Sequence, residues 1–298
     1  MGPRQIKSQI KSQIKSQIRG QRSGTRSGAR PRAARRYRRG MPQPEAHAER
    51  FTGLAGTYAR FRPSYPTAAF NAMLEGLARD GRAIAAVDVG CGTGISTRLL
   101  AAAGARVVGV DCNADMLDEA RRDGESSTAI TWHRAAAEAT GLESGGFDLV
   151  LCAQAFHWFD QPMALAEFAR LLRPHGRLAL LWNIRDGSDP FTAAYSRIIA
   201  AEADRVDPTM RDAREALDAA IWNSVLFEGA RRLEFDSPQP LDEEGVLGRA
   251  LSASYFPRET PRRSELLEAL RAAFREHARG GVATLAHRAR LTLATRVA

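Results

Sequence analysis

Short apolar runs alternate with longer amphipathic segments through the middle of the chain. The apolar runs, which predict buried strands, cover residues 84–89, 106–111, 129–132, 147–153 and 177–182. Apolar positions at helical spacing fill several of the intervals, at residues 94–103, 114–122 and 162–172. Strands and helices that alternate with short connections are typical of a parallel sheet covered by helices on both faces. The pattern therefore predicts an α/β fold.

The pattern becomes mainly helical after residue 182. Helices are predicted within residues 189–228, 242–252 and 261–278, a short strand at residues 231–235 and a late strand at residues 282–297. A helix is also predicted after Pro66, and the Arg-Pro-His-Gly segment at residues 173–176 predicts a turn from a helix into the next strand. The helical region at about 187–280 is large enough to cover the binding edge of the sheet.

Charge divides the chain into two parts. Residues 1–40 hold 13 Lys and Arg and no Asp or Glu, whereas the rest holds 30 basic and 34 acidic groups, a net charge of −4. The basic part begins with the repeat IKSQIKSQIKSQI and continues in Arg, Ser and Gly, which predicts a disordered low-complexity tail. Open alternatives are upstream sequence that has been translated ahead of a true start at Met41, a membrane-surface or nucleic-acid-binding arm, and an organellar transit peptide.

Cysteine use and hydropathy restrict the class of protein further. The three cysteines, Cys91, Cys112 and Cys152, form no CxxC pair or Cys/His cluster, so we expect neither a metal site nor disulfides. No apolar run approaches the ~18 residues of a membrane helix. We therefore expect a soluble cytoplasmic protein, and the acidic balance of residues 41–298 disfavours a nucleic-acid partner for the folded domain.

A glycine-rich turn follows the first predicted strand. The segment from Val87 to Gly94 reads VDVGCGTG, and a predicted helix begins directly after it. Glycines allow positive φ and a close ligand approach, and the free amides of a helix N-terminus attract anionic groups. A nicotinamide or flavin motif, GxGxxG, would need glycine where the chain has Ile95. Instead, Gly90 and Gly92 form GxGxG with Gly94.

An acidic residue ends the second predicted strand, which reads VVGVD at residues 107–111. Asp111 lies 21 residues after Gly90. A carboxylate at this place can accept hydrogen bonds from both ribose hydroxyls of an adenosine. The glycine turn and Asp111 together favour an adenosine-containing cofactor.

These segments, with FDLV at residues 147–150, resemble the class I S-adenosylmethionine-dependent methyltransferases. Three further motifs are similar to a small-molecule subgroup that includes trans-aconitate methyltransferase-like enzymes: YARFRPSYP at 58–66, QAFHWF at 154–159 and WN at 182–183. The resemblance covers residues 51–186 well and the rest in outline. It implies one methyltransferase domain over residues 41–298, with a Rossmann-like, mostly parallel seven-stranded sheet, a cofactor-binding core at about 80–186 and a substrate cover at about 187–280.

The resemblance also implies a set of residues that bind S-adenosylmethionine. At the methionine end these are Asp88, which faces the ammonium group, with Gln154 and Ala155. Beneath the cofactor they are Gly90, Gly92 and Gly94, and at the ribose and adenine they are Asp111, Met116, Ala136 and Ala137. Family members often carry an acid near position 136, whereas this chain reads RAAAE at residues 134–138. The adenine contact there would fall to the backbone.

The segment after the fourth predicted strand lies at the carboxyl edge of the sheet, where ligands bind in open α/β folds. His157 is a candidate general base for an acceptor that must lose a proton. The alternative is that His157 caps the next helix or fixes a loop. Trp158 is expected to stack on the acceptor or the cofactor. His133, His175 and His287 have no partner pattern and are interpreted as ordinary surface or core residues.

Four other residues are candidates for the acceptor site. Arg62 and Tyr65 suit the binding of a carboxylate, of the acceptor or of the cofactor. The alternative is a rigid extended connector in which Tyr65 is packed down. Arg185 and Tyr255 are expected in the wall of the site.

The sequence thus predicts transfer of a methyl group from S-adenosylmethionine to a small molecule, at a carboxylate or hydroxyl. One alternative is a cofactor-binding protein of the same fold without transfer activity. Another is an RNA methyltransferase that uses the basic tail. Neither the acceptor nor the oligomeric state follows from the sequence.

Overall fold

The computed structural model describes residues 53–77, 81–122, 128–206, 219–253, 255–257 and 261–298. The chain divides into two units, Met1–Gln43 and Pro44–Ala298, and all of the described residues belong to the second. The predicted basic tail, residues 1–40, lies outside the described residues. Within them, no helix combines the length and the apolar character that crossing a membrane requires.

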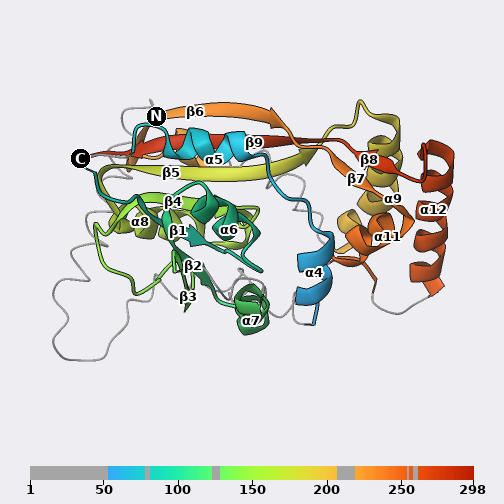
Figure 1. Cartoon of the computed structure of the whole chain (residues 1–298), viewed down its shortest axis with the longest axis horizontal. Coiled ribbons are helices and arrows are strands. Elements are labelled where there is room, and N and C mark those ends of the chain that lie inside the picture. The colour runs from blue at the N-terminus through green and yellow to red at the C-terminus, as the bar shows by residue number, and fades with distance from the viewer. Residues whose placement is uncertain (1–52, 78–80, 123–127, 207–218, 254, 258–260) are drawn as a thin grey trace, which may run out of the picture. The chain divides into compact units, whose positions relative to one another are not determined.

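Seven strands of the described residues form one sheet (Figure 1). In the order β3-β2-β1-β4-β5-β9-β6 they are Ile130–Arg134, Arg106–Asp111, Ala85–Val89, Phe147–Ala153, Leu172–Arg185, His287–Arg296 and Phe227–Asp236. Neighbouring strands from β3 to β5 are parallel, while β9 is antiparallel to both β5 and β6. The predicted α/β fold with a mostly parallel seven-stranded sheet is therefore confirmed.

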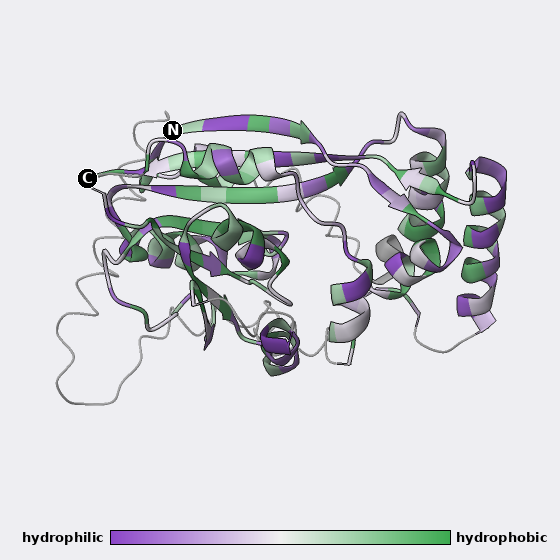
Figure 2. Ribbon diagram, in the orientation of Figure 1, coloured by the Kyte–Doolittle hydropathy of each residue, from purple (hydrophilic) through white to green (hydrophobic). Residues whose placement is uncertain are grey.

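Helices pack on both faces of this sheet because successive side chains of a buried strand point to opposite faces. Leu149 and Leu151 of β4 pack with α5, Thr67–Leu74, and α6, Ile95–Ala102. Val150 and Cys152 pack on the other face with α8, Gln161–Leu171. Figure 2 shows the consequence in β5, whose middle is coloured hydrophobic because both of its faces are covered. The helix α7, Ala114–Arg122, packs against β2 and β3.

Three strands differ from their predicted bounds. The predicted turn at residues 173–176 lies inside β5 as an irregularity, where Leu172 pairs with Phe147 and Arg177 with Leu149. His175 has φ 62 there. The late strand predicted at residues 282–297 is broken at Ala286 into β8 and β9. Finally, β6 begins at residue 227, so the mainly helical segment ends sooner than predicted.

A second hydrophobic cluster is built by the C-terminal half of the chain. It involves α9, Pro190–Val206; α11, Glu243–Leu251; α12, Pro261–His277; and a small sheet of β7, Gln239–Leu241, with β8, Ala283–Leu285. On α12 the hydrophobic and hydrophilic colours alternate along the helix (Figure 2), and its buried residues follow helical spacing: Leu266, Leu270, Ala273 and Phe274. The short helix α4, Ala55–Phe61, contacts both α11 and α7 (Figure 1).

Candidate active site

The carboxyl ends of β1 and β4 lie side by side at the point where the chain changes direction across the sheet. From β1 the chain continues to β2 on one side, and from β4 it continues to β5 on the other. Ligands of open α/β sheets bind outside the strand ends at such a switch point. The two loops that leave here contain the glycine turn and the Gln154 segment, so the topology brings the two predicted motifs together.

The three glycines of the turn are required for different structural reasons. Gly90, at φ 75, has no room for a side chain, because a Cβ there would lie 2.5 Å from Cβ of Ala155. A Cβ on Gly94, at φ 82, would lie 2.4 Å from the ring of Trp132. Gly92, at φ 54, differs because a Cβ built on it meets nothing within 4 Å. Packing thus requires Gly90 and Gly94, while Gly92 presents bare backbone to open space, as a cofactor cradle needs.

Asp111 ends β2 beside this turn. Its Oδ2 accepts a hydrogen bond from the Gly92 amide and its Oδ1 one from the Asn113 amide, both at 2.9 Å. Burial raises the pKa of Asp111, and the backbone hydrogen bonds reduce this effect. Each carboxylate oxygen retains a lone pair after accepting one amide. The carboxylate is therefore held in place and can still accept two hydroxyl groups.

Asp88, in β1, is completely buried. Its Oδ2 accepts hydrogen bonds from the hydroxyls of Ser96 and Thr97, each at 2.7 Å, whereas Oδ1 has no hydrogen-bond partner among the described residues. Burial raises the pKa of Asp88 to about 6, and the charge of Asp111 acts in the same direction. An orphaned carboxylate oxygen of this kind fits the predicted partner, an ammonium group.

The remaining adenine-side residues lie on α7 and on the loop between β3 and β4. Met116 is 4% exposed, and its amide donates to Asn113 Oδ1 at 3.2 Å. Ala136 is half-buried and Ala137 is buried. The loop leaves β3 beside Asp111, because the amide of Ala135 donates to the Asp111 carbonyl at 3.1 Å. The predicted backbone contact from residues 136 and 137 stays a prediction.

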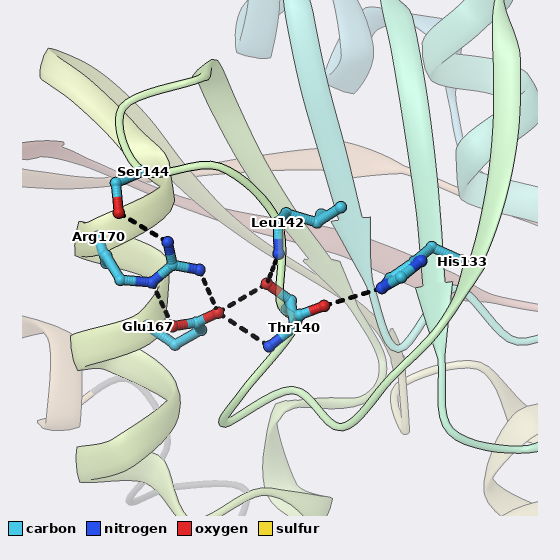
Figure 3. A network of polar contacts seen from close by, with 6 residues as sticks. All are labelled: His133, Thr140, Leu142, Ser144, Glu167 and Arg170. Carbon is cyan, nitrogen blue, oxygen red and sulfur yellow. Dashed lines mark hydrogen bonds and ion pairs between the residues drawn. The ribbon is translucent and has the colours of Figure 1, made fainter. Parts of the chain in front are cut away.

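A buried polar network anchors this loop to α8 (Figure 3). The amide and hydroxyl of Thr140 donate to Oε1 of Glu167 at 2.9 and 2.6 Å. Arg170 donates to both carboxylate oxygens of Glu167 at 2.7 Å, and His133 donates from Nε2 to the Thr140 carbonyl at 2.8 Å. Burial alone would raise the pKa of Glu167, but the bonds from Arg170 and Thr140 outweigh it and lower that pKa. The charged, bonded carboxylate thus fixes the loop.

The segment after β4 places two aromatic rings around His157. Its ring centroid lies 4.4 Å from that of Trp158 and 5.4 Å from that of Trp182. The next helix, α8, is capped by Asp160, whose Oδ1 accepts from the Met163 amide at 3.1 Å. The alternative that His157 caps this helix is therefore wrong. Its predicted role as a base stays open.

Gln154 connects this segment to the end of β5. It has φ 57, its amide donates to the Leu181 carbonyl at 2.9 Å, and its Nε2 donates to the Asn183 carbonyl at 3.3 Å. Ala155, which follows, is buried against Gly90. Both residues lie at the edge where the methionine end of the cofactor is predicted.

The predicted acceptor residues have different surroundings. Arg62 donates to the Ser252 carbonyl at 2.8 Å, and Arg185 donates to the Tyr255 hydroxyl at 3.4 Å. Tyr65, in contrast, packs edge-on against Phe70 at 6.3 Å between ring centroids. Burial raises the pKa of Tyr65 well above its usual value, and the negative charge of Asp88 contributes. The charges of both Asp88 and Arg62 thus act on the Tyr65 hydroxyl, and the ring is packed down as the connector alternative predicts.

Sequence reasoning missed two charged or titratable residues beside Arg185. Arg249, in α11, is 8% exposed, and His287, at the start of β9, is 4% exposed. The signal for Arg249 was available, because it falls on the same helix face as the apolar Val246 and Ala250. His287 was interpreted as ordinary; its proximity to Arg185 arises from the pairing of β9 with β5, which local sequence does not reveal.

Known proteins are similar in sequence to this part of the chain. A family model described as "Methyltransferase domain" matches residues 87–180, from the middle of β1 into β5. An uncharacterised methyltransferase of Mycobacterium bovis is 39% identical over 156 residues, which is 52% of this chain and 61% of that protein. An uncharacterised methyltransferase-like protein of Schizosaccharomyces pombe is 35% identical over 143 residues, 48% of this chain and 54% of that protein. The chain thus spans less than two thirds of the length of each relative.

Solved structures extend the likeness to the fold. A structure from Anaeromyxobacter dehalogenans, assigned as a type II methyltransferase, has a TM-score of 0.54 and 25% identity, covering 80% of this chain and 98% of its own. One from Anabaena variabilis, assigned as a methyltransferase of an antibiotic biosynthesis pathway, has a TM-score of 0.54 and 20% identity, with 78% and 98% covered. With the strand order and the glycine turn, these matches identify residues 87–180 as a class I S-adenosylmethionine-dependent methyltransferase domain.

Proposed function

We propose that the protein transfers a methyl group from S-adenosylmethionine to a small-molecule acceptor. One observation carries this proposal. Asp111 is held by the Gly92 and Asn113 amides at 2.9 Å, directly beside the open space over Gly92. A glycine turn and a strand-end carboxylate in this relation suit an adenosine ribose. The family match over residues 87–180 supports S-adenosylmethionine as the cofactor.

The proposed cofactor residues lie at or near the carboxyl ends of the neighbouring strands β3, β2, β1 and β4, or on the segments that follow them. Asp111 would bind the ribose hydroxyls, and Met116 with residues 136–137 would contact the adenine. Asp88, with its orphaned Oδ1, would face the ammonium group. When bound, the cofactor supplies the activated methyl group on its sulfonium. The chain's part is to hold the acceptor in line with that group, since alignment alone lowers the barrier of a displacement strongly.

His157 is the proposed general base for an acceptor that loses a proton. It lies between Trp158 and Trp182 on the loop that leaves β4 at the switch point. Aromatic neighbours fix the ring plane and limit access of water. The base and the cofactor residues come from adjacent strand ends, which supports proton removal near the reacting methyl group.

The C-terminal elements are proposed to cover the acceptor. Arg185 and Tyr255 contact each other, although they come from β5 and from the segment after α11. A cover built from α9, α11 and α12 would exclude water from the acceptor. The acceptor atom, a carboxylate or a hydroxyl oxygen, is left to experiment.

Calorimetric titration of the full chain tests the cofactor assignment. We expect binding of S-adenosylmethionine and S-adenosylhomocysteine and no binding of NAD. Asp111→Ala should weaken cofactor binding by about 1.5–3 kcal/mol for each charge-assisted hydrogen bond that is lost. Asp118→Asn is the matched control, because Asp118 lies in the neighbouring helix α7 with an exposed side chain.

Each alternative predicts a different result in these experiments. Equal affinity of the Asp111→Ala variant and the unmodified chain would show that the ribose assignment is wrong. Cofactor binding without labelled-methyl transfer to any small-molecule pool would favour the binding protein without transfer activity. His157→Ala tests the base separately: unchanged turnover on an acceptor found in this way would exclude His157 and leave the methyltransferase proposal intact.

A further inference from the structure

Three arginines from distant parts of the chain lie close together, and we call them the arginine cluster. They are Arg62 after α4, Arg185 at the end of β5 and Arg249 in α11. Arg62 donates to the carbonyl of Ser252, the residue that caps α11, at 2.8 Å. Arg185 donates to the hydroxyl of Tyr255 at 3.4 Å. Arg62 and Arg185 thus both contact the segment that follows Arg249 at the end of α11, and their charges act on the Arg249 guanidinium.

Among the described residues, no carboxylate forms an ion pair with the arginine cluster. There, Arg62 and Arg185 contact neutral carbonyl and hydroxyl oxygens and aromatic rings. Arg249 is 8% exposed, and its Nε has no hydrogen-bond partner among those residues. Nε of Arg62 is likewise buried without a partner there. The donors of the cluster are thus only partly used.

The three cations also act on one another. Burial, together with the charges of Arg62 and Arg185, lowers the pKa of Arg249 to about 10. A buried cation without a counter-charge opposes folding, because both desolvation and like-charge repulsion are unfavourable. An anion that enters the cluster would relieve both effects at once.

The neighbouring polar groups leave the cluster cationic and add hydroxyl donors. Burial lowers the pKa of His287 to about 4, with contributions from Arg249 and Arg185, so His287 is neutral at pH 7. Its Nδ1 donates to the Leu285 carbonyl at 3.1 Å. Tyr255 contributes a hydroxyl beside Arg185. The chemistry of the site, guanidinium forks with a hydroxyl, suits the oxygens of a carboxylate or a phosphate.

A short series of hydrogen bonds connects the cluster to the cofactor edge. Nδ2 of Asn183 donates to the carbonyl of Ser64, two residues after Arg62, at 3.0 Å. Nε2 of Gln154 donates to the carbonyl of Asn183 at 3.3 Å. Gln154 directly follows β4 at the switch point. A group bound by the cluster would therefore lie near the end of the site where the methyl group is predicted.

We propose that Arg62, Arg185 and Arg249 together bind an anionic group, a carboxylate or a phosphate, of the methyl acceptor. The inference rests on the proposed function only in identifying the ligand as the acceptor. The anion site itself follows from the three unbalanced guanidinium groups. It adds Arg249, a residue of the C-terminal cover, to the residues that select the acceptor.

The test uses the full chain and two probes, sodium phosphate and sodium succinate, with sodium chloride at equal ionic strength as the reference. Isothermal titration and the unfolding midpoint Tm are measured for each salt. We expect one or both probes to bind and to raise Tm above the chloride value. Phosphate alone would identify a phosphate site, and succinate alone a carboxylate site.

Arg249→Met makes the decisive comparison, because it keeps the apolar stem and removes the charge. We expect its affinity for the bound probe to fall at least tenfold, and its Tm in chloride to exceed that of the unmodified chain. A merely structural Arg249 would instead give a lower Tm and an unchanged affinity. Arg249→Lys should retain part of the binding. Arg60→Gln is the charge-matched control, since Arg60 is exposed in α4 and pairs with Glu244 at 2.8 Å.

The outcomes separate cleanly. Equal affinity in Arg249→Met and the unmodified chain, or no binding beyond chloride, would overturn the proposal. Arg62→Gln carries the same comparison if Arg249→Met does not fold. Titration of the same samples with S-adenosylhomocysteine keeps the two proposals apart. Failure of the cofactor to bind while the anion binds would reject the proposed function and not the anion site, and the converse would reject the anion site alone.

Discussion

Residues of the same type have different roles at this site, and only their surroundings separate them. Gly90 and Gly92 both have positive φ, but a side chain at Gly90 would collide with Ala155 whereas one at Gly92 would enter open space. Asp88 is completely buried and Asp111 is half-buried. Each oxygen of Asp111 accepts one amide and keeps a lone pair, whereas Oδ1 of Asp88 accepts nothing from the described residues. The two carboxylates therefore suit different ligand groups, hydroxyls at Asp111 and an ammonium at Asp88.

The raised pKa of Asp88 predicts a pH dependence of cofactor binding. Its pKa is about 6 without cofactor, mainly because of burial. The charged carboxylate attracts the cofactor's ammonium group, so affinity should fall as pH decreases through 6 and Asp88 becomes protonated. Linkage gives a loss of up to about tenfold between pH 7 and pH 5. Calorimetry with S-adenosylhomocysteine at several pH values measures it.

Asp88→Asn is the control for this prediction. The variant should bind more weakly at pH 7 and lose the part of the profile centred near pH 6. Asp111, whose pKa is also raised by burial, is present in both proteins, so the difference between the two profiles reports the loss of the Asp88 carboxylate. Superimposable profiles would mean that Asp88 does not contact the cofactor's charge.

At the scale of elements, local patterns predict what lies along one strand or one turn. The four strands β1 to β4 and the glycine turn were predictable because their apolar runs and their glycines are continuous in sequence. β7 was not, since it has three residues and depends on its partner, and β8 was predicted only as part of one longer strand with β9. The arginine cluster was missed as a unit because Arg62, Arg185 and Arg249 meet only after β5 and α11 are in place. Arg62 and Arg185 were each predicted as acceptor residues, but Arg249, their common neighbour, was not.

The amino ends of the central strands are joined by an ion cluster opposite the cofactor edge. Asp148, at the start of β4, accepts from both terminal nitrogens of Arg82 at 2.7 and 2.6 Å and from the Ala85 amide at 2.9 Å. Arg173 of β5 lies 2.7 Å away. Burial alone would raise the pKa of Asp148, but these bonds outweigh it and lower that pKa to about 2. One carboxylate thus connects β1, β4 and β5.

Asp148→Asn should therefore destabilise the fold by about 2 kcal/mol at pH 7. A carboxyl whose pKa is lowered in the folded state stabilises the fold at pH values above its pKa in the unfolded state. This stabilisation is lost as the pH falls towards 2, the pKa in the folded state. The difference between variant and unmodified chain should accordingly shrink below pH 4. Chemical denaturation at pH 7, 4 and 3 measures it, with Glu143→Gln, an exposed position, as the control. A difference that stays constant with pH would contradict the ionic explanation.

For the whole molecule, the uneven distribution of charge sets the choice between a small acceptor and RNA. Residues 1–40 hold 13 basic residues and no acidic ones, while the remaining residues hold 34 acidic and 30 basic groups, so the positive net charge of +9 is due to the tail. The candidate site lies wholly in residues 53–298, and its acceptor end uses arginines from within the fold. Nonspecific attraction to nucleic acid and the proposed chemistry are therefore assigned to different parts of the chain.

Removal of residues 1–40 should leave the chemistry unchanged. A chain beginning at Met41 should bind S-adenosylhomocysteine within about twofold of the full chain, because no proposed cofactor residue is lost. Labelled methyl transfer into a small-molecule fraction should be equal in both, whereas salt-sensitive binding of the full chain to RNA should disappear. A full-length variant with the 13 basic residues of the tail changed to Gln separates charge from length. If label enters RNA and this incorporation is lost in both altered proteins, the acceptor is RNA and the small-molecule proposal fails, since the tail's charge would then be delivering the substrate.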